Sequence, residues 1–304
     1  MLPVGDYVLS EKIPASGYTT ATDVPFTIKD TGEIQKVVMK DDITKLQIIK
    51  TDEEGKQLPG NRLAIIDKDG KTVDEWITDE KPHDITKLVV GQEYTLRELE
   101  AAAGYTKAED IIFIVRDTND VQTIDMSNRQ TEMHFSKVDE TGEKELPGAK
   151  LQIIDKDGNI IDQWVSTEEQ HTITGLSEGQ TYVMKEISAP YGYEIAEEIT
   201  FTAGDGQKVT MKDKMIRSYI KVNKVDYYDH KDILKVAEFT LYSDAACTKK
   251  ISAAKTDTKN GIALFDDLTY GTYFIKETKA PAGYELSDEV VKVTVDDEWV
   301  NGDD

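Results

Sequence analysis

The sequence predicts an all-β chain made of tandem antiparallel β-sandwich domains. Hydrophobic residues alternate with period two through most of the chain, and a long stretch of sequence is duplicated. Asp69-Gly70 and Asp157-Gly158 lie between apolar segments, as tight hairpin turns do. About seven short strands fit each unit of roughly 85 residues, which is typical of a β-sandwich. We expect no long amphipathic helix.

The duplication predicts the domain organisation. Leu58-Pro59-Gly60 to Gly104-Tyr105 matches Leu146-Pro147-Gly148 to Gly192-Tyr193 almost position for position. A third, more distant copy starts near Ser218 and lacks the Trp that the first two share. We expect an incomplete repeat at 1–42 and domains at 43–129, 130–215 and 216–304. The last of these domains is either complete or truncated at its end.

Residues 1–42 align with only the back half of a repeat. They contain Glu11 and a closing strand from Val37 to Asp41, but no lysine-bearing first strand. We therefore expect the chain to be cut from a longer array. We also expect this fragment to pair poorly unless something supplies its missing strands.

Charge and composition exclude several classes of partner. The formal net charge of −23 argues against nucleic acid and anionic membranes, which would repel such a surface. A single cysteine, Cys247, excludes an intrachain disulfide framework and a cysteine-based zinc site. No apolar run approaches the ~18–20 residues of a membrane helix, and the first residues do not resemble a signal peptide. Either the protein is cytosolic or its targeting segments lie outside this sequence.

Three residue types recur on the core-facing side of the predicted strands. A lysine ends an apolar alternation, a glutamate ends a Tyr-x-apolar-x-Glu segment, and an Asn or Asp closes the last strand. The first set is Lys50, Glu98 and Asn128, the second is Lys137, Glu186 and Asp213, and Lys224 and Glu277 begin a third. Charged groups are strongly disfavoured in a core, so these positions need an explanation.

Burial removes charge from both reactants of an amide bond. A desolvated lysine loses its proton and becomes a nucleophile, while a desolvated glutamate keeps its proton. Such a glutamate can donate to the Asn or Asp carbonyl under attack and then move protons to the leaving group. The pattern predicts a covalent Lys–Asn or Lys–Asp bond, with ammonia or water as the leaving group. The alternative is an ordinary buried ion pair or a lysine at a strand end.

The acyl partner of the third set has two candidates. Asn301 shares the parity of Asp213, and we prefer it to Asp297, which leaves too few residues for both closing strands. In residues 1–42, Glu11 and Asp41 have no lysine, so no internal bond is expected there.

A longer motif gives a specific resemblance. Leu-x-x-Gly-x-Tyr-x-apolar-x-Glu-x-x-Ala-Pro-x-Gly-Tyr, at Leu176 to Tyr193 and Leu268 to Tyr284, resembles the collagen-adhesin B-type (prealbumin-like) repeat of Gram-positive surface proteins and pilins. The resemblance covers essentially the whole chain. It implies a cell-wall-attached stalk with isopeptide bonds from Lys50 to Asn128 and from Lys137 to Asp213, catalysed by the glutamates. The family usually has Asn at the acyl position, so Asp213 and Asp41 are departures.

Two other motifs have ordinary structural interpretations. Asp67-Lys-Asp69-Gly70 resembles the start of a calcium loop, but the glycine comes too early and no glutamate closes it, so we expect a hairpin. His83 and His171 have no second histidine at ligand spacing and are expected at strand edges. Trp76 and Trp164 are expected to cover the edge of their own sheet rather than to stack on a sugar.

These features predict a structural spacer of an extracellular, Gram-positive cell-surface protein or pilin. It would need no cofactor or metal, would perform no turnover catalysis, and would have covalent cell-wall or pilus neighbours. One alternative is an adhesin module that binds a host matrix protein or glycan. The residues that suggest it are the aromatic side chains of Trp76, Trp164 and Trp299. Another is an enzyme with β-sandwich appendages, but no segment outside the repeats could house its cleft.

Overall fold

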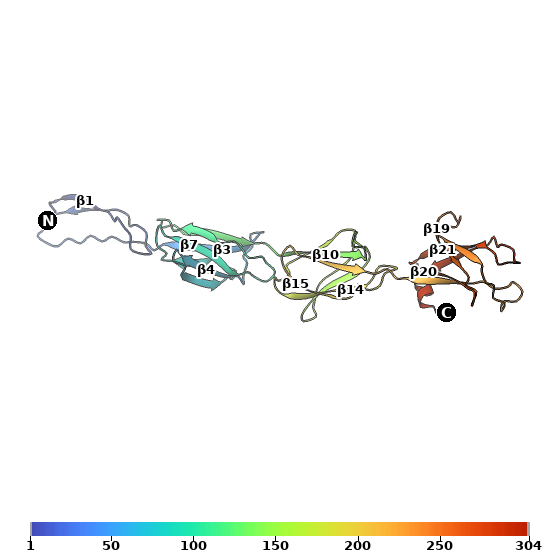
Figure 1. The fold of residues 1–304 in the computed structure, drawn as a ribbon. Helices are drawn as coiled ribbons and strands as arrows, with labels where there is room; N and C mark the ends of the chain where they lie inside the picture. Colours follow the sequence, from blue (N-terminus) through green and yellow to red (C-terminus); the bar gives the residue numbers. More distant parts are fainter. Residues whose placement is uncertain (1, 303–304) are drawn as a thin grey trace. The chain divides into compact units, whose positions relative to one another are not determined.

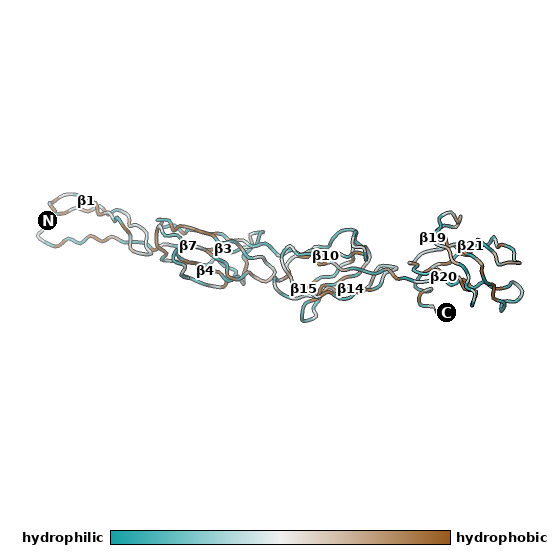
Figure 2. Tube along the Cα trace, viewed as in Figure 1, coloured by the Kyte–Doolittle hydropathy of each residue, from teal (hydrophilic) through white to brown (hydrophobic). Residues whose placement is uncertain are grey.

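The structure is a computed structural model that describes residues 2–302. The chain divides into two compact units. One contains the residues up to 134 together with 172–181 and 202–208, and the other contains the rest. Among residues 2–302, strands make up nearly all of the regular structure, so the predicted all-β class is confirmed (Figure 1). Figure 2 shows the alternation of hydrophobic and hydrophilic residues along these strands.

The first described residues form a two-stranded hairpin. Strand β1 (Gly5–Leu9) pairs antiparallel with β2 (Val24–Ile28). Residues 37–41, the predicted closing strand of this fragment, lie outside any strand. The expected poor pairing of the fragment agrees with this arrangement.

The first repeat contains seven strands in two sheets. They are β3 (Lys45–Asp52), β4 (Arg62–Asp67), β5 (Thr72–Ile77), β6 (His83–Thr86), β7 (Glu93–Glu100), β8 (Ile111–Ile114) and β9 (Gln122–Asn128). The sheet orders are β6-β3-β9 and β5-β4-β7-β8. Inward residues of both sheets, including Ile48, Leu63 and Leu96, form one buried core. All pairs are antiparallel except β3 and β9, the first and last strands, which run parallel.

The second repeat has the same order of strands. They are β10 (Glu132–Asp139), β11 (Lys150–Asp155), β12 (Ile160–Val165), β13 (His171–Thr174), β14 (Thr181–Ser188), β15 (Ile199–Thr202) and β16 (Lys208–Asp213). Their sheet orders are β13-β10-β16 and β12-β11-β14-β15, so β16 occupies the place that β9 has in the first repeat.

In the third repeat, as far as the described residue 302, this last strand is absent. It contains β17 (Ser218–Asn223), β18 (Glu238–Tyr242), β19 (Lys250–Lys255), β20 (Ile262–Leu268), β21 (Gly271–Lys279), β22 (Val290–Val295) and the helix α1 (Asp297–Asn301). The sheet orders are β17-β20 and β19-β18-β21-β22. Among residues 2–302, β17 therefore has a partner on one edge only.

The predicted Asp-Gly hairpins are confirmed. Strands β4 and β5 pair antiparallel, as do β11 and β12. In the first hairpin, Asp67 Oδ1 accepts hydrogen bonds from the amides of Asp69 and Lys71, which closes the turn. Gly70 has a φ of 81°, a left-handed conformation that favours glycine. These contacts make Asp67 a turn-forming residue.

The five-residue α1 is the one helix of the described chain, so no helix there is long and apolar enough to span a membrane.

Candidate isopeptide sites

Each repeat holds its glutamate in the same way. In the three repeats the residue lies on the core-facing side of the strand that contains the Tyr-x-apolar-x-Glu pattern, because side chains alternate between the two faces, whereas Glu11 follows the end of β1. In every copy, one carboxylate oxygen, Oε2, accepts a hydrogen bond from the backbone amide ten residues later. The pairs are Glu11 with Ala21 (2.8 Å), Glu98 with Ala108 (2.5 Å), Glu186 with Ala196 (2.6 Å) and Glu277 with Ser287 (3.0 Å). This bond fixes the carboxyl group and leaves its second oxygen available for other groups.

The first repeat brings the three predicted residues together. Lys50, Glu98 and Asn128 are all buried, with exposed fractions of 2%, 0% and 2%. The Lys50 Nζ donates to Asn128 Oδ1 over 2.5 Å and lies 3.9 Å from Glu98 Oε1. Burial lowers the pKa of Lys50 to about 8, although the charge of Glu98 opposes this shift. The lysine is therefore far easier to deprotonate than an exposed one.

The glutamate faces the nitrogen of Asn128 and not its carbonyl. Asn128 Nδ2 donates to Glu98 Oε1 over 2.9 Å, while the carbonyl oxygen faces Lys50. The sequence predicts that Glu98 donates to this carbonyl, and the structure differs from that prediction. The acid contacts the group that would leave as ammonia.

A fourth residue, Asn61, completes this site and was missed by sequence analysis. It is fully buried, donates from Nδ2 to Leu58 O over 2.8 Å, and accepts from Asn128 Nδ2 over 3.3 Å. The second repeat has Ala149 at this position, within an otherwise identical Leu-Pro-Gly segment. Of these two repeats, only the first has Asn at this position, and only the first has Asn instead of Asp as its closing residue. This difference between the repeats was the available signal.

The second repeat brings Lys137, Glu186 and Asp213 together in a buried cluster. The Lys137 Nζ contacts Asp213 Oδ1 and lies 2.9 Å from Glu186 Oε1. Glu186 Oε1 and Asp213 Oδ2 are both buried without a hydrogen-bond partner. Burial raises the pKa of Asp213 to about 6, against the opposing effect of Lys137. The site contains one amine and two acids, the components of a condensation that releases water.

Within residues 2–302, the third repeat has the lysine and the glutamate without the acyl partner that the first two repeats have. The Lys224 Nζ lies 3.1 Å from Glu277 Oε1, and the lysine side chain is 22% exposed. The structure does not bring Asn301 or Asp297 to this pair. Both belong to α1, where Asn301 Nδ2 donates to Asp297 O over 2.8 Å. The side chain of Asp296 accepts from the Trp299 amide and caps this helix, which turns the segment away from an extended strand.

The repeated Trp and His residues pack against each other. The Trp76 and His83 rings stack at 4.0 Å, and His83 Nε2 lies 2.9 Å from Asp74 Oδ2. The second repeat has the same stack between Trp164 and His171, at 4.2 Å. Trp76 also packs against the core of its repeat, as predicted for a residue that covers its own sheet. No group of three potential metal ligands exists among residues 2–302.

Comparison with known proteins gives one family and a set of similar folds. The family model of the SpaA prealbumin-like fold domain matches residues 44–130, 131–215 and 218–302. The Bacillus anthracis TIE protein has a similar structure, with a TM-score of 0.60 and 24% identity over 95% of this chain, which spans 56% of that one. The major pilin subunit BcpA of Bacillus cereus gives a TM-score of 0.50 and 16% identity over 84% of this chain and 96% of that one. At these identities the likeness concerns the fold alone. Sequence comparison with curated proteins gives no match.

Proposed function

The chain belongs to the family of SpaA prealbumin-like fold domains, and from this we propose that it is a stalk segment of a Gram-positive surface protein or pilin. Its first two repeats are locked by self-formed isopeptide bonds. One observation carries the proposal: a buried lysine amine contacts the acyl group of the last strand in both repeats, with a buried glutamate beside it. In the first repeat this arrangement supports a reaction between the two groups more than a passive ion pair, because Asn128 carries no charge to pair with Lys50.

In the first repeat the reaction releases ammonia. The neutral Lys50 Nζ attacks Cγ of Asn128, and a C–N bond forms. The bond from Cγ to Nδ2 then breaks, and Glu98 transfers the proton lost by Nζ to the departing Nδ2, which it already contacts at 2.9 Å. The product is an amide and one ammonia. Because the fold holds the two groups in contact, even a slow reaction goes to completion.

In the second repeat the same steps release water. Asp213 reacts as the neutral acid, which its raised pKa of about 6 favours. Lys137 Nζ attacks Cγ, and the C–O bond of the carboxyl group breaks while Glu186 moves the proton to the departing hydroxyl. Each site reacts once, so neither repeat is a turnover catalyst.

The bond would join the first and last strands of a repeat. Lys50 lies in β3 and Asn128 ends β9, so tension applied to the two ends of the domain would pass through the covalent bond and bypass the hydrogen bonds between strands. The bond also restricts the unfolded chain, which in the entropic model for a loop of this length stabilises the domain by about 4–5 kcal/mol. Both effects suit an extracellular spacer whose one cysteine allows no internal disulfide.

Intact-protein mass spectrometry tests this proposal. The protein should be lighter than its sequence by one ammonia and one water. Glu98→Gln should restore the ammonia alone, and Glu186→Gln the water alone. Glu277→Gln is the matched control and should leave the monomer's deficit unchanged. A parent protein with the full sequence mass would refute the bonds and leave ion pairs.

A further inference from the structure

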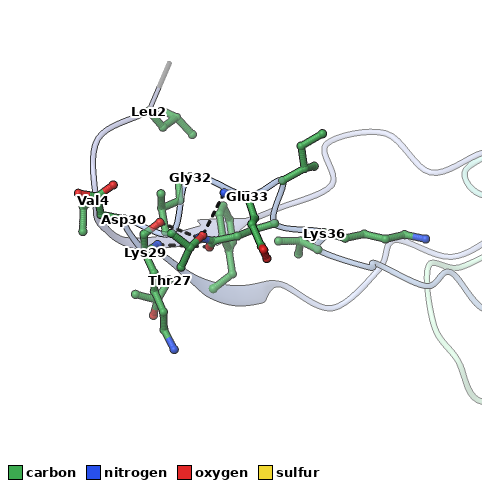
Figure 3. Close-up of a pocket in the computed structure, with 14 residues that line it drawn as sticks. Leu2, Val4, Thr27, Lys29, Asp30, Gly32, Glu33 and Lys36 are labelled. Atoms are coloured by element: carbon green, nitrogen blue, oxygen red, sulfur yellow. Dashed lines mark hydrogen bonds between the residues drawn. The ribbon is translucent and has the colours of Figure 1, made fainter.

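A hollow of about 680 Å³ beside strand β2 is not built to select between similar chemical groups. It is lined by Leu2, Val4 and residues 26–37 (Figure 3), and every one of these residues is exposed or half-buried. An unpaired polar group costs little where water can replace its partner, so such selection requires a buried site. The lysine site of the first repeat is buried, because its four polar residues are at most 2% exposed.

The orientation of the Asn61 side chain in this site is fixed by backbone groups. Its Nδ2 donates to Leu58 O over 2.8 Å, and its Oδ1 accepts from the Ala102 amide over 2.9 Å. A backbone carbonyl only accepts and a backbone amide only donates, so these two bonds determine which end of the Asn61 side chain is the oxygen. That oxygen therefore faces Asn128 as an acceptor.

This acceptor in turn fixes the orientation of the Asn128 amide. The two hydrogens of Asn128 Nδ2 have two acceptors, Asn61 Oδ1 at 3.3 Å and Glu98 Oε1 at 2.9 Å. Turning the amide over would place its carbonyl oxygen against these two oxygens and would break the bond from Lys50 Nζ to Asn128 Oδ1. The carbonyl is therefore held toward the attacking amine, and the leaving nitrogen toward the acid.

The second repeat has a different pair of residues beside its acyl group. Ala149 occupies the position of Asn61, and the amide of each donates to a hydroxyl oxygen 17 residues later. Pro190 occupies the position of Ala102, and the carbonyl of each accepts from the amide three residues later. Proline has no amide hydrogen, so no side chain has to accept one there. The third repeat has the same kind of pair, Ala237 and Pro281.

The number of hydrogens on the acyl group matches the number of acceptors in each site. A neutral carboxyl group has one hydrogen, whereas the amide of Asn128 has two. Asp213 Oδ2 and Glu186 Oε1 are both buried without a hydrogen-bond partner. Burial and, to a smaller extent, Glu186 raise the pKa of Asp213 to about 6, which favours a proton between the two acids. The apolar Ala149 presents no further oxygen to Asp213.

We propose that Asn61 makes the first site select an amide as its acyl group, and that Ala149 lets the second site accept a carboxylic acid. The inference rests on the isopeptide chemistry proposed above. In Asn128→Asp, Lys50 Nζ would still attack Cγ, a C–O bond would break and water would leave. However, Oδ2 would face two acceptors, Glu98 Oε1 and Asn61 Oδ1, with at most one hydrogen. At least one contact would then join two buried oxygens with no hydrogen between them.

The test compares the rates of bond formation in four chains: the parent, Asn61→Ala, Asn128→Asp and the double variant. Newly folded chain is quenched in acid denaturant, and its intact mass gives the ammonia or water lost from the first repeat. Asn61→Ala alone should slow the loss of ammonia several-fold. Asn128→Asp should react at least about tenfold more slowly than the double variant, both measured at pH about 6. The water lost from the second repeat is the internal control and should be the same in all four chains.

The sign of the Asn61→Ala effect separates selection from a structural role. Loss of packing would slow the reactions of the amide and of the acid alike, whereas selection slows the first and speeds the second. If Asn61→Ala slows both while the parent loses its ammonia, this inference is wrong and the proposed function stands. A parent chain that loses no ammonia would refute the proposed function and this inference together.

Two further variants control for stability and for folding of the first repeat. Asn61→Ala leaves the Ala102 amide without its acceptor, and Ala102→Pro removes that amide hydrogen, as in the second repeat. The triple variant with Asn128→Asp should therefore react at least as fast as the double variant. Asp213→Asn tests the selection with the first repeat intact: its amide has two hydrogens and lacks the acceptor that Asn61 provides, so bond formation there should slow about tenfold. An unchanged rate in Asp213→Asn would overturn the inference.

Discussion

The closed lysine sites of the first two repeats and the open site of the third share most of their parts. All three have a lysine at the end of a first strand, and all three anchor a glutamate to the amide ten residues later. They differ in the closing strand. Lys50 and Lys137 are 2% exposed, whereas the Lys224 side chain is 22% exposed. The comparison shows that the glutamate is positioned by its own sheet. The closing strand buries the lysine away from water and also supplies the acyl group.

Removing the lysine should affect the closed and open sites very differently. Lys137→Met would prevent the bond and leave the Asp213 and Glu186 carboxyls buried without a cation. We expect the free energy of unfolding of the second repeat to fall by at least about 5 kcal/mol at neutral pH. Lys224→Met should lower that of the third repeat by only about 1 kcal/mol, because water already reaches this lysine. Calorimetry, with Trp164 fluorescence to assign the second repeat, measures both.

The loss in Lys137→Met should shrink at acid pH. The folded pKa of Asp213 is already raised above its usual 3.8, to about 6, and removing Lys137 removes an effect that lowers it. Lowering the pH through this range protonates the buried carboxyl and relieves the penalty, so stability should partly recover. Equal losses in Lys137→Met and Lys224→Met would contradict the distinction between closed and open sites.

The two closed sites should respond to pH in opposite directions. Bond formation in the first repeat needs neutral Lys50, so its rate should rise about tenfold per pH unit up to the lysine pKa of about 8. In the second repeat the reactive form is neutral Asp213, so its rate should fall about tenfold per unit above pH about 6. Newly synthesised chain, folded at fixed pH and quenched in acid denaturant, gives the two rates from its ammonia and water deficits. Parallel pH profiles would refute these roles.

The stability of the first repeat before bond formation depends on the pKa of Lys50. Its folded pKa, about 8, lies below the ordinary 10.5, so between these values the folded first repeat binds fewer protons than the unfolded one. The stability of the unlinked repeat should therefore rise with pH across this window. Glu98→Gln, which stays unlinked, is the variant in which to measure it.

Period-two parity predicts which residues of the candidate sites face the core, and these residues are buried in the first two repeats. The features that parity does not predict depend on local caps or on long-range contacts. Leu46, Ile48 and Lys50 share one face of a strand because side chains alternate, and this holds whatever the strand pairs with. The parallel pairing of β3 with β9 depends on partners about 76 residues apart, as the register of Lys50 with Met126 shows, and no local pattern encodes it. The helix at 297–301 results from a local cap at Asp296 that competes with the strand expected there.

Asn61 distinguishes the two closed sites and gives a smaller effect. Its Oδ1 accepts from the leaving nitrogen of Asn128 and from the Ala102 amide, and the second repeat has Ala149 in its place. Asn61→Ala should slow bond formation in the first repeat several-fold, because Asn128 loses one of its two acceptors, and lower its stability by about 1–2 kcal/mol. The ammonia deficit against time measures the rate, and Ala149→Asn is the reciprocal variant. An unchanged rate with reduced stability would make Asn61 purely structural.

The smallest expected effect concerns the Trp–His stack, which the first two repeats have and the third lacks. In the third repeat Ala254 lies opposite Phe239, the register that Trp76 and Leu63 occupy in the first. His83→Ala removes the stack at 4.0 Å and the contact with Asp74, and should lower the stability of the first repeat by about 1 kcal/mol. His134→Ala, a histidine outside any such stack, is the control and should cost less. Since the stack lies outside the lysine site, His83→Ala should leave the ammonia deficit intact; a loss of that deficit would show that sheet-edge packing and bond formation are coupled.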